Sequence, residues 1–210
     1  MSMRYTLRLF KGGSSTAFRN AMEQTAKSSN AVLIWNRVDD QDMRLCHNDK
    51  VHTLYIPYRS GADDRFCEAL GKHLALPWME LRIQDGALWD YALCDGVRGV
   101  DNFSTLPQYW DDIENPDPDV LKGWKGNPQL LASLWVLPVR RIERYLVNWG
   151  CQRDPSRPRG YRHVLTGKAY PSDRAPYGDY EQFFDFLHAL GRAEPTERHS
   201  LILPPLSQWK

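Results

Sequence analysis

The sequence lacks the cysteine spacing and the long hydrophobic runs that identify several large classes of protein. Its four cysteines are far apart and form no C-x-x-C pair, which is typical of free thiols in a reducing compartment. No apolar run approaches the roughly 20 residues that span a bilayer, and the beginning of the chain contains no secretory segment. We therefore expect a cytoplasmic protein that has no membrane association.

Charged residues almost balance over the whole chain, but they do not balance along it. The 27 Lys and Arg against 26 Asp and Glu give a formal charge of +1, so the molecule as a whole has no strong attraction for nucleic acid or an anionic membrane. Residues 101–119 contain six acidic and no basic side chains, whereas residues 137–174 contain nine basic and three acidic ones. Opposed segments of this kind suit contacts with other proteins.

No catalytic or cofactor-binding motif stands out. The six histidines form no H-x-x-x-H or H-E-x-x-H set, and Cys94 beside Asp95 has no identifiable base. Residues 12–15, Gly-Gly-Ser-Ser, lack the Lys-Ser/Thr of a phosphate-binding loop, and a strand-to-helix turn with a cap explains them. We expect no catalytic residue, no metal and no cofactor. An enzyme site that the fold assembles from scattered residues stays open as an alternative.

Aromatic and apolar residues are plentiful, and their spacing predicts an α+β fold. Apolar residues make up 42% of the chain, with eight Trp and ten Tyr among 210 residues, which favours a compact domain. Alternating apolar side chains predict a strand over 4–10, and Ser14 or Ser15 is expected to cap a helix that ends near Lys27. The further elements expected here are strands at 31–35, 51–58 and 78–84 and a helix at 63–74. This is the order of a ferredoxin-like β-α-β-β-α-β unit, an antiparallel sheet with two helices on one face.

Two local patterns place elements within this predicted sheet. The continuous apolar run at 31–35 is typical of a central strand, and the stretch 39–49 that follows it is polar. Asp85-Gly86 and Asp95-Gly96 are hairpin-turn dipeptides, and they predict that the sheet continues as a meander through 88–94 and 97–103.

The rest of the chain is expected to form a C-terminal helical layer. Residues 104–125 are rich in Pro and Asp and are interpreted as a loop. Helices are predicted at 128–135, 138–149 and 179–190, the last of them ended by Gly191, and the apolar tail is expected to pack on the body. We thus divide the chain into an α+β sheet domain at 1–105 and an acidic loop with a helical region at 106–210, packed together as one compact unit.

The predicted helix pair at 128–149 has two interpretations. A helix-turn-helix would use its small residue Ala132, its β-branched Ile142 and three exposed arginines, Arg140, Arg141 and Arg144, which could meet phosphates or guanine edges. The turn position, however, holds Val136, where a left-handed conformation is strained for a β-branched residue. We favour an α-α hairpin that packs on the sheet, with its arginines solvated or paired to the acidic segment.

Two further segments are candidate interaction sites. The acidic segment could contact a basic partner through its carboxylates Asp111, Asp112, Glu114, Asp117 and Asp119. It lacks the glycine and terminal glutamate of a calcium-binding loop, so a solvated loop or a protein contact is the preferred interpretation. The basic loop combines positive charge with an aromatic ring, as single-stranded nucleic-acid sites do, through Arg153, Arg157, Arg159, Tyr161 and Arg162. The alternative is a plain exposed loop.

Part of the chain resembles a family of uncharacterised bacterial proteins that has no assigned activity. The resemblance covers residues 75–134 and lies in WDYALCDGVRGVDNF, a Pro-x-Tyr-aromatic run and WKGNPQLLASLW. The matching positions are mostly aromatic or turn residues and are expected to be architectural: Trp89, Tyr91, Asp101, Phe103, Pro107 and Tyr109. The resemblance implies a bacterial origin and supplies no mechanism.

These observations favour a non-enzymatic protein-interaction module. A specific form of this hypothesis is an accessory or immunity-type protein of a bacterial defence or toxin system, an idea that rests on association only. The competing hypothesis is a nucleic-acid-binding protein that uses the helix pair and the basic loop. The partner in the first case is another protein.

Overall fold

The computed structural model describes residues 5–36, 43–47, 50–56, 62–110, 115, 117–153, 161–192, 197–203, 205 and 207. The chain divides into two compact units, each of which contains segments from both halves of the chain. The unit that we call the ferredoxin-like unit consists of Thr6–Glu80, Leu93–Gly99 and Gly191–Lys210. The unit that we call the aromatic unit consists of Met1–Tyr5, Leu81–Ala92 and Val100–Leu190.

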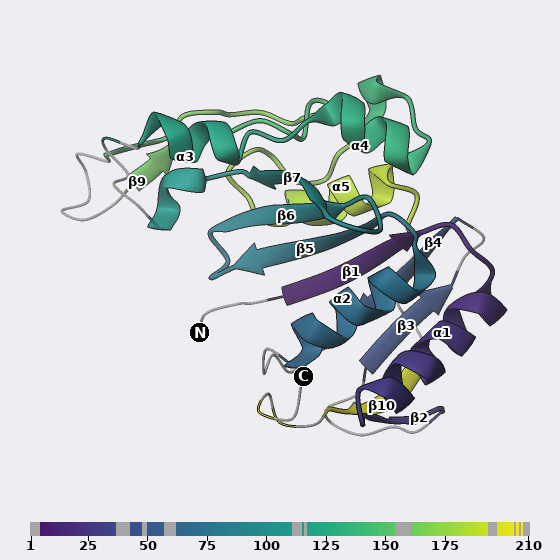
Figure 1. Cartoon of the computed structure of the whole chain (residues 1–210). Helices are drawn as coiled ribbons and strands as arrows, with labels where there is room; N and C mark the ends of the chain where they lie inside the picture. The colour runs from purple at the N-terminus through teal and green to yellow at the C-terminus, as the bar shows by residue number, and fades with distance from the viewer. Residues whose placement is uncertain are drawn as a thin grey trace. The chain divides into compact units, whose positions relative to one another are not determined.

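The ferredoxin-like unit confirms the predicted α+β class. Apart from the short edge strand β2 (Val32–Ile34), its elements through Glu80 follow the β-α-β-β-α-β order. Its elements are β1 (Tyr5–Lys11), α1 (Ser15–Ser28), β3 (Met43–His47), β4 (Val51–Tyr55), α2 (Ala62–Leu74) and the start of β5 (Trp78–Gln84). The neighbouring strands follow the order β3-β4-β1-β5, and β4 pairs antiparallel with both β1 and β3. Both helices lie on the same face of these strands (Figure 1).

The core of this unit forms where the apolar faces of the two helices meet the sheet. The buried side chains come from alternate strand positions and from helical positions three or four residues apart. They are Phe10, Met43, Leu45, Leu54 and Ile56 from the sheet side and Phe18, Ala21, Met22, Ala26, Phe66, Cys67 and Leu70 from the helices. The Ser14 side chain accepts a hydrogen bond from the Ala17 amide at 3.2 Å, so the predicted cap of α1 is confirmed.

The apolar run at 31–35 is not a central strand, and that expectation was wrong. It forms the short strand β2 (Val32–Ile34), which pairs only with β10 (Glu197–Ile202) and leaves Val32 52% exposed. The partner of β4 is instead β3, from the stretch that we regarded as polar. Met43 and Leu45 are buried there and Arg44 between them is exposed, which is the alternation of a half-buried strand.

The C-terminal segment packs on the body, as expected, and it does so as a strand inside the sheet. β10 lies between β2 and β3 and pairs antiparallel with both. Ser200 is opposite Ile34, and Arg198 is opposite Arg44. Leu201 and Leu203 are partly buried against the unit's core, whereas Ile202 between them is 57% exposed.

The aromatic unit contains the end of β5, most of β6 (Leu88–Cys94) and of β7 (Gly99–Ser104), and the helical segments that follow. Asp85 and Gly86 have φ values of 54° and 66°, which is the left-handed pair of a type I′ hairpin turn and confirms the predicted turn. The Trp89 ring stacks on Phe186 with centroids 4.9 Å apart, and Phe103 lies 5.0 Å from Trp89. Aromatic residues thus fill the interior of this unit.

Short elements connect this sheet segment to the C-terminal layer. In chain order they are η1 (Pro107–Trp110), α3 (Pro118–Gly123), α4 (Pro128–Trp135), η2 (Val139–Arg141), β8 (Cys151–Arg153), β9 (Tyr161–His163) and α5 (Gln182–Ala189). The segment 104–125, expected to be a loop, therefore contains two short helices. Gly191 follows α5 with a φ of 80°, as a helix-ending glycine does. No helix among the described residues is both long enough and apolar enough to cross a membrane.

The helix predicted at 138–149 does not form, and this part of the helix-pair prediction was wrong. After η2 the chain continues as turns in which most backbone hydrogen bonds join residues three apart, such as Ile142 to Val139 and Tyr145 to Ile142. Val136 does adopt the left-handed conformation, with φ 55° and ψ 53°, so the strain that we expected there is present. Trp135, Ile142 and Trp149 are fully buried, so this segment packs inward.

Candidate functional site

The turn segment that replaces the predicted helix is held by two tyrosine hydroxyls from a distant part of the chain. The Tyr170 hydroxyl donates to the Arg140 carbonyl at 2.6 Å, and the Tyr177 hydroxyl donates to the Arg144 carbonyl at 2.8 Å. Burial raises the pKa of both phenols, so they keep the protons that they donate. The backbone that carries the three arginines is therefore fixed in place.

A pocket of about 550 Å³ opens beside this segment, within the aromatic unit. We call it the arginine pocket. It is lined by Pro138, Arg140, Arg141, Tyr145, Tyr170, Ser172, Asp173, Asp185, His188 and Ala189. The lining residues come from the turn segment, from the loop after β9 and from α5, so the fold assembles the site from three separate stretches of the chain.

The carboxylate of Asp173 forms part of the lining and accepts hydrogen bonds from donors within the protein. It accepts the Tyr145 hydroxyl at 2.7 Å and the Tyr170 amide at 2.9 Å. Burial raises the pKa of Tyr145, and the hydrogen bond to Asp173 raises it further. The phenol stays protonated, and Asp173 serves to hold the wall of the pocket together.

Asp185 is occupied in the same way. Its Oδ2 atom accepts the backbone amides of Arg174 and Ala175, both at 2.9 Å. Two amide donors on one oxygen fix the loop that precedes α5 and leave this carboxylate tied to the backbone. Neither acid of the pocket is paired with an arginine side chain.

The arginines at the pocket have no acidic partner among the described residues. Arg140 and Arg141 are exposed, and the Arg141 guanidinium contacts only the His188 carbonyl, at 3.4 Å. The guanidinium of Arg144 lies 5.5 Å from the centre of the Tyr170 ring, which is a cation–π distance. The formal charges of the lining side chains cancel, but the two acids already accept hydrogen bonds from within the protein, whereas the arginines have no acidic partner among the described residues.

The structure brings together three of the predicted basic residues. Arg140 and Arg141 line the pocket, and Arg144 stacks on a residue of its wall. Arg162 is exposed in β9 and is not part of the pocket, while Arg153 and Tyr161 are described only by their backbones in β8 and β9. Arg157 and Arg159 lie outside the described residues.

The acidic segment is described only in part. Asp111, Asp112 and Glu114 lie outside the described residues. Asp117 and Asp119 are exposed at the start of α3, where the Asp117 side chain accepts the Asp119 amide at 2.8 Å. Asp117 therefore caps a short helix, which is a structural role for this acid.

Sequence reasoning missed the residues that complete the arginine pocket, Tyr145, Tyr170, Asp173, Asp185 and His188. Tyr170-Pro-Ser-Asp173 is a turn sequence, and the Asp173 amide does bond back to the Tyr170 carbonyl at 3.1 Å. Asp173 is also one of the few acids in the basic region. These were the available signs of a site, but the pairing of Tyr170 with Arg140 depends on the tertiary fold.

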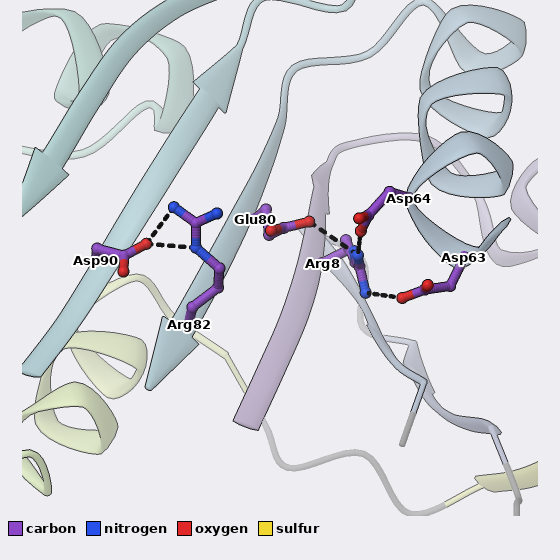
Figure 2. A network of polar contacts seen from close by, with 6 residues as sticks. All are labelled: Arg8, Asp63, Asp64, Glu80, Arg82 and Asp90. Carbon is purple, nitrogen blue, oxygen red and sulfur yellow. Dashed lines mark hydrogen bonds and ion pairs between the residues drawn. The ribbon is translucent and has the colours of Figure 1, made fainter. Parts of the chain in front are cut away.

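A second charged cluster lies in the ferredoxin-like unit, where it connects secondary-structure elements. The fully buried Arg8 of β1 pairs with Glu80 at 2.9 Å, with Asp63 at 3.3 Å and with Asp64, as Figure 2 shows. Asp63 is equally buried, and both aspartates stand in the first turn of α2. The cluster ties α2 to β1 and β5 through the buried Arg8, so we interpret it as structural.

Burial disfavours the reactive thiolate form of three cysteines. Burial raises the pKa of the Cys67 thiol to about 12 and also raises those of Cys94 and Cys151. No group of three or more His, Cys, Asp or Glu is placed to hold a metal ion in the part of the chain that the structure describes.

No protein-family model, curated protein or solved structure matches this chain.

Proposed function

We propose that the protein is a non-enzymatic interaction module that binds an acidic segment of a partner protein at the arginine pocket. The observation that supports this proposal most directly is the difference between the two kinds of charge at the pocket. Both carboxylates accept hydrogen bonds from internal donors, whereas the arginines have no acidic partner among the described residues. Arginine pairs with carboxylates bidentately, so an acidic side chain is the natural ligand.

The fixed backbone strengthens this proposal. Tyr170 and Tyr177 hold the carbonyls of Arg140 and Arg144, so fewer degrees of freedom are lost when a partner binds. Tyr145 and Tyr170 add aromatic surface to the pocket, and Tyr and Arg are the residues that most often dominate protein interfaces. A role as an accessory or immunity-type protein of a bacterial defence or toxin system is the specific form of this proposal.

A charge-reversal experiment tests the proposal. Proteins that co-purify with the wild type should be lost with the double variant Arg140→Glu/Arg141→Glu, because two repelling charges would face the acidic partner. The matched control is Arg162→Glu, an exposed arginine outside the pocket, which should retain the partner. Retention by the double variant, or equal loss in the control, would contradict this assignment of the binding surface.

Nucleic-acid binding is the second candidate function, and the stack of Arg144 on Tyr170 favours it, because such pairs also receive bases and phosphates. A labelled single-stranded oligonucleotide tests it by fluorescence anisotropy at increasing salt. A nucleic-acid site requires binding that weakens steeply with salt and is reduced by both Arg144→Glu and Arg162→Glu. Absence of binding at low salt eliminates this candidate.

A further inference from the structure

A second pocket of the aromatic unit has a charged lining whose formal charges cancel. It encloses about 520 Å³, within the range of small-molecule sites. Its polar lining residues come from the sheet and are Arg82 and Gln84 of β5, Asp90 of β6 and Ser104 of β7. Its apolar lining residues are Pro107 of η1, Val120 of α3 and Trp124, which follows α3.

The lining centres on a largely buried ion pair. The Nε and NH2 nitrogens of Arg82 both lie 2.5 Å from Oδ1 of Asp90, as drawn in Figure 2. The Asp90 side chain is only 6% exposed and the Arg82 side chain 21%. A buried ion pair seldom stabilises a protein more than apolar residues of the same volume would. On the wall of this pocket the pair places a positive and a negative group side by side.

The apolar side of the pocket is fixed to the sheet. The Ser104 amide donates to the Trp124 carbonyl at 3.0 Å, and Lys125 forms a bridge with Phe103 of β7. The Ser104 hydroxyl oxygen already accepts the Leu106 amide at 3.2 Å, and a hydroxyl that accepts can still donate its own proton. An aromatic residue and a set of donors and acceptors are thus held on the walls of one cavity.

We propose that this pocket binds a neutral pyranose sugar. An anionic ligand would meet the Asp90 carboxylate and a cationic one the Arg82 guanidinium, so an uncharged ligand fits best. Sugar hydroxyls both donate and accept, and the lining holds the Gln84 amide and the Ser104 hydroxyl beside the Arg82–Asp90 pair. The apolar C–H face of the ring suits the indole of Trp124 and the neighbouring Val120 and Pro107.

Saturation-transfer NMR tests this proposal with the full chain and a panel of common monosaccharides and disaccharides at millimolar concentration. We expect transfer to the ring C–H protons of at least one sugar. Trp124→Ala should weaken its binding about tenfold, as the loss of an aromatic stacking partner does. Gln84→Ala, on the polar side, should weaken it independently and serves if Trp124→Ala fails to fold. Trp35→Ala, a partly buried tryptophan of the ferredoxin-like unit, is the matched control.

Each other outcome overturns the proposal. If no sugar in the panel receives saturation transfer, the proposed sugar binding is wrong. Binding that Trp124→Ala and Gln84→Ala leave unchanged places the ligand elsewhere. Transfer to nucleosides tested alongside the panel, with none to sugars, overturns the assignment of a sugar as the ligand. The double variant Arg140→Glu/Arg141→Glu should bind sugar normally, so the two pockets are tested separately.

Discussion

Arg8 is the cation shared by three carboxylates in the ferredoxin-like unit. Its guanidinium is fully buried and meets the carboxylates of Asp63, Asp64 and Glu80 (Figure 2). Replacing it by methionine keeps most of the volume but leaves the three acids without their shared cation. We expect Arg8→Met to lower the free energy of unfolding by about 3–5 kcal/mol, measured by urea denaturation.

The control for Arg8 is an exposed ion pair in the same unit. Arg98 is 81% exposed and lies 3.8 Å from Asp95. Arg98→Met should change the free energy of unfolding by no more than about 1 kcal/mol, because exposed pairs are screened by water. Equal effects of the two substitutions would contradict the structural role of the buried cluster.

His52 makes the stability of the fold depend on pH. Its side chain is buried, stacks on Phe18 with centroids 4.5 Å apart and bonds to the Gly13 carbonyl at 3.1 Å. Burial lowers the pKa of His52 below its ordinary value of about 6.5, although the backbone contact partly opposes this shift. The unfolded chain thus binds a proton more readily than the folded chain does.

The sign of the pH effect follows from this difference in affinity. The contribution of His52 to stability is complete above about pH 6.5 and is lost as the pH falls below that value. His52→Gln should therefore flatten the decrease in unfolding free energy between about pH 7 and pH 5. Leu54→Ala, which destabilises the same core without removing a titrating group, should keep the slope. An unchanged slope in His52→Gln would remove this explanation.

At the scale of elements, the end of α4 contains a strained residue. Val136 is 81% exposed and has a left-handed conformation, with φ 55°. Asparagine tolerates this conformation, so Val136→Asn should raise the free energy of unfolding by about 1 kcal/mol. Val164→Asn replaces another exposed valine of the unit that has no positive φ and should bring no gain. An equal rise in the free energy of unfolding in both variants would indicate that lower surface hydrophobicity, and not relief of the strained backbone at Val136, is the cause.

The start of α4 requires a glycine. Gly126 has a φ of 74°, and a Cβ there would lie 3.1 Å from the Phe103 side chain and the Tyr91 hydroxyl. Gly126→Ala should lower the free energy of unfolding by about 2–4 kcal/mol, since overpacking and an unfavourable φ add together. Gly123→Ala is the control, because no atom lies within 4 Å of its Cβ position and alanine favours a helix. The unfolding midpoints of the two variants should move in opposite directions.

Local patterns in the sequence predicted those elements whose stability is local. The alternation in β1, the serine cap of α1 and the Asp85-Gly86 turn each depend on residues close together in the chain. The helix expected at 138–149 failed because hydroxyls of Tyr170 and Tyr177 bind its backbone carbonyls. Its apolar periodicity was real, since Ile142 and Trp149 are buried, but it also fits a series of tight turns.

The candidate sites could be predicted only in part for a similar reason. The basic residues of 140–144 were visible as a cluster of charge. Whether an arginine stays free depends on which donors occupy Asp173 and Asp185, and those donors are a tyrosine hydroxyl and backbone amides placed by tertiary contacts. The ion pair of Arg82 and Asp90 lies across two strands, and nothing in its spacing indicated a pocket.

At the scale of the whole molecule, the sheet of the ferredoxin-like unit depends on its most distant strand. A chain that ends at Arg192 would lack β10, and β2 and β3 would lose the partner between them. We expect such a chain to lose protection from hydrogen exchange throughout β3 and to unfold without a sharp transition. Adding a peptide of residues 193–207 should restore protection, and a truncated chain already protected without the peptide would contradict this prediction.

The position of β10 also sets the order of events on the ribosome. The amino-terminal strands leave the exit tunnel long before the segment that completes their sheet is translated, because most of the chain separates β3 from β10. During that interval an apolar strand edge has no covering, which is the condition under which nascent chains recruit chaperones. We therefore expect the early strands to be most prone to association with other chains in the interval before β10 is translated.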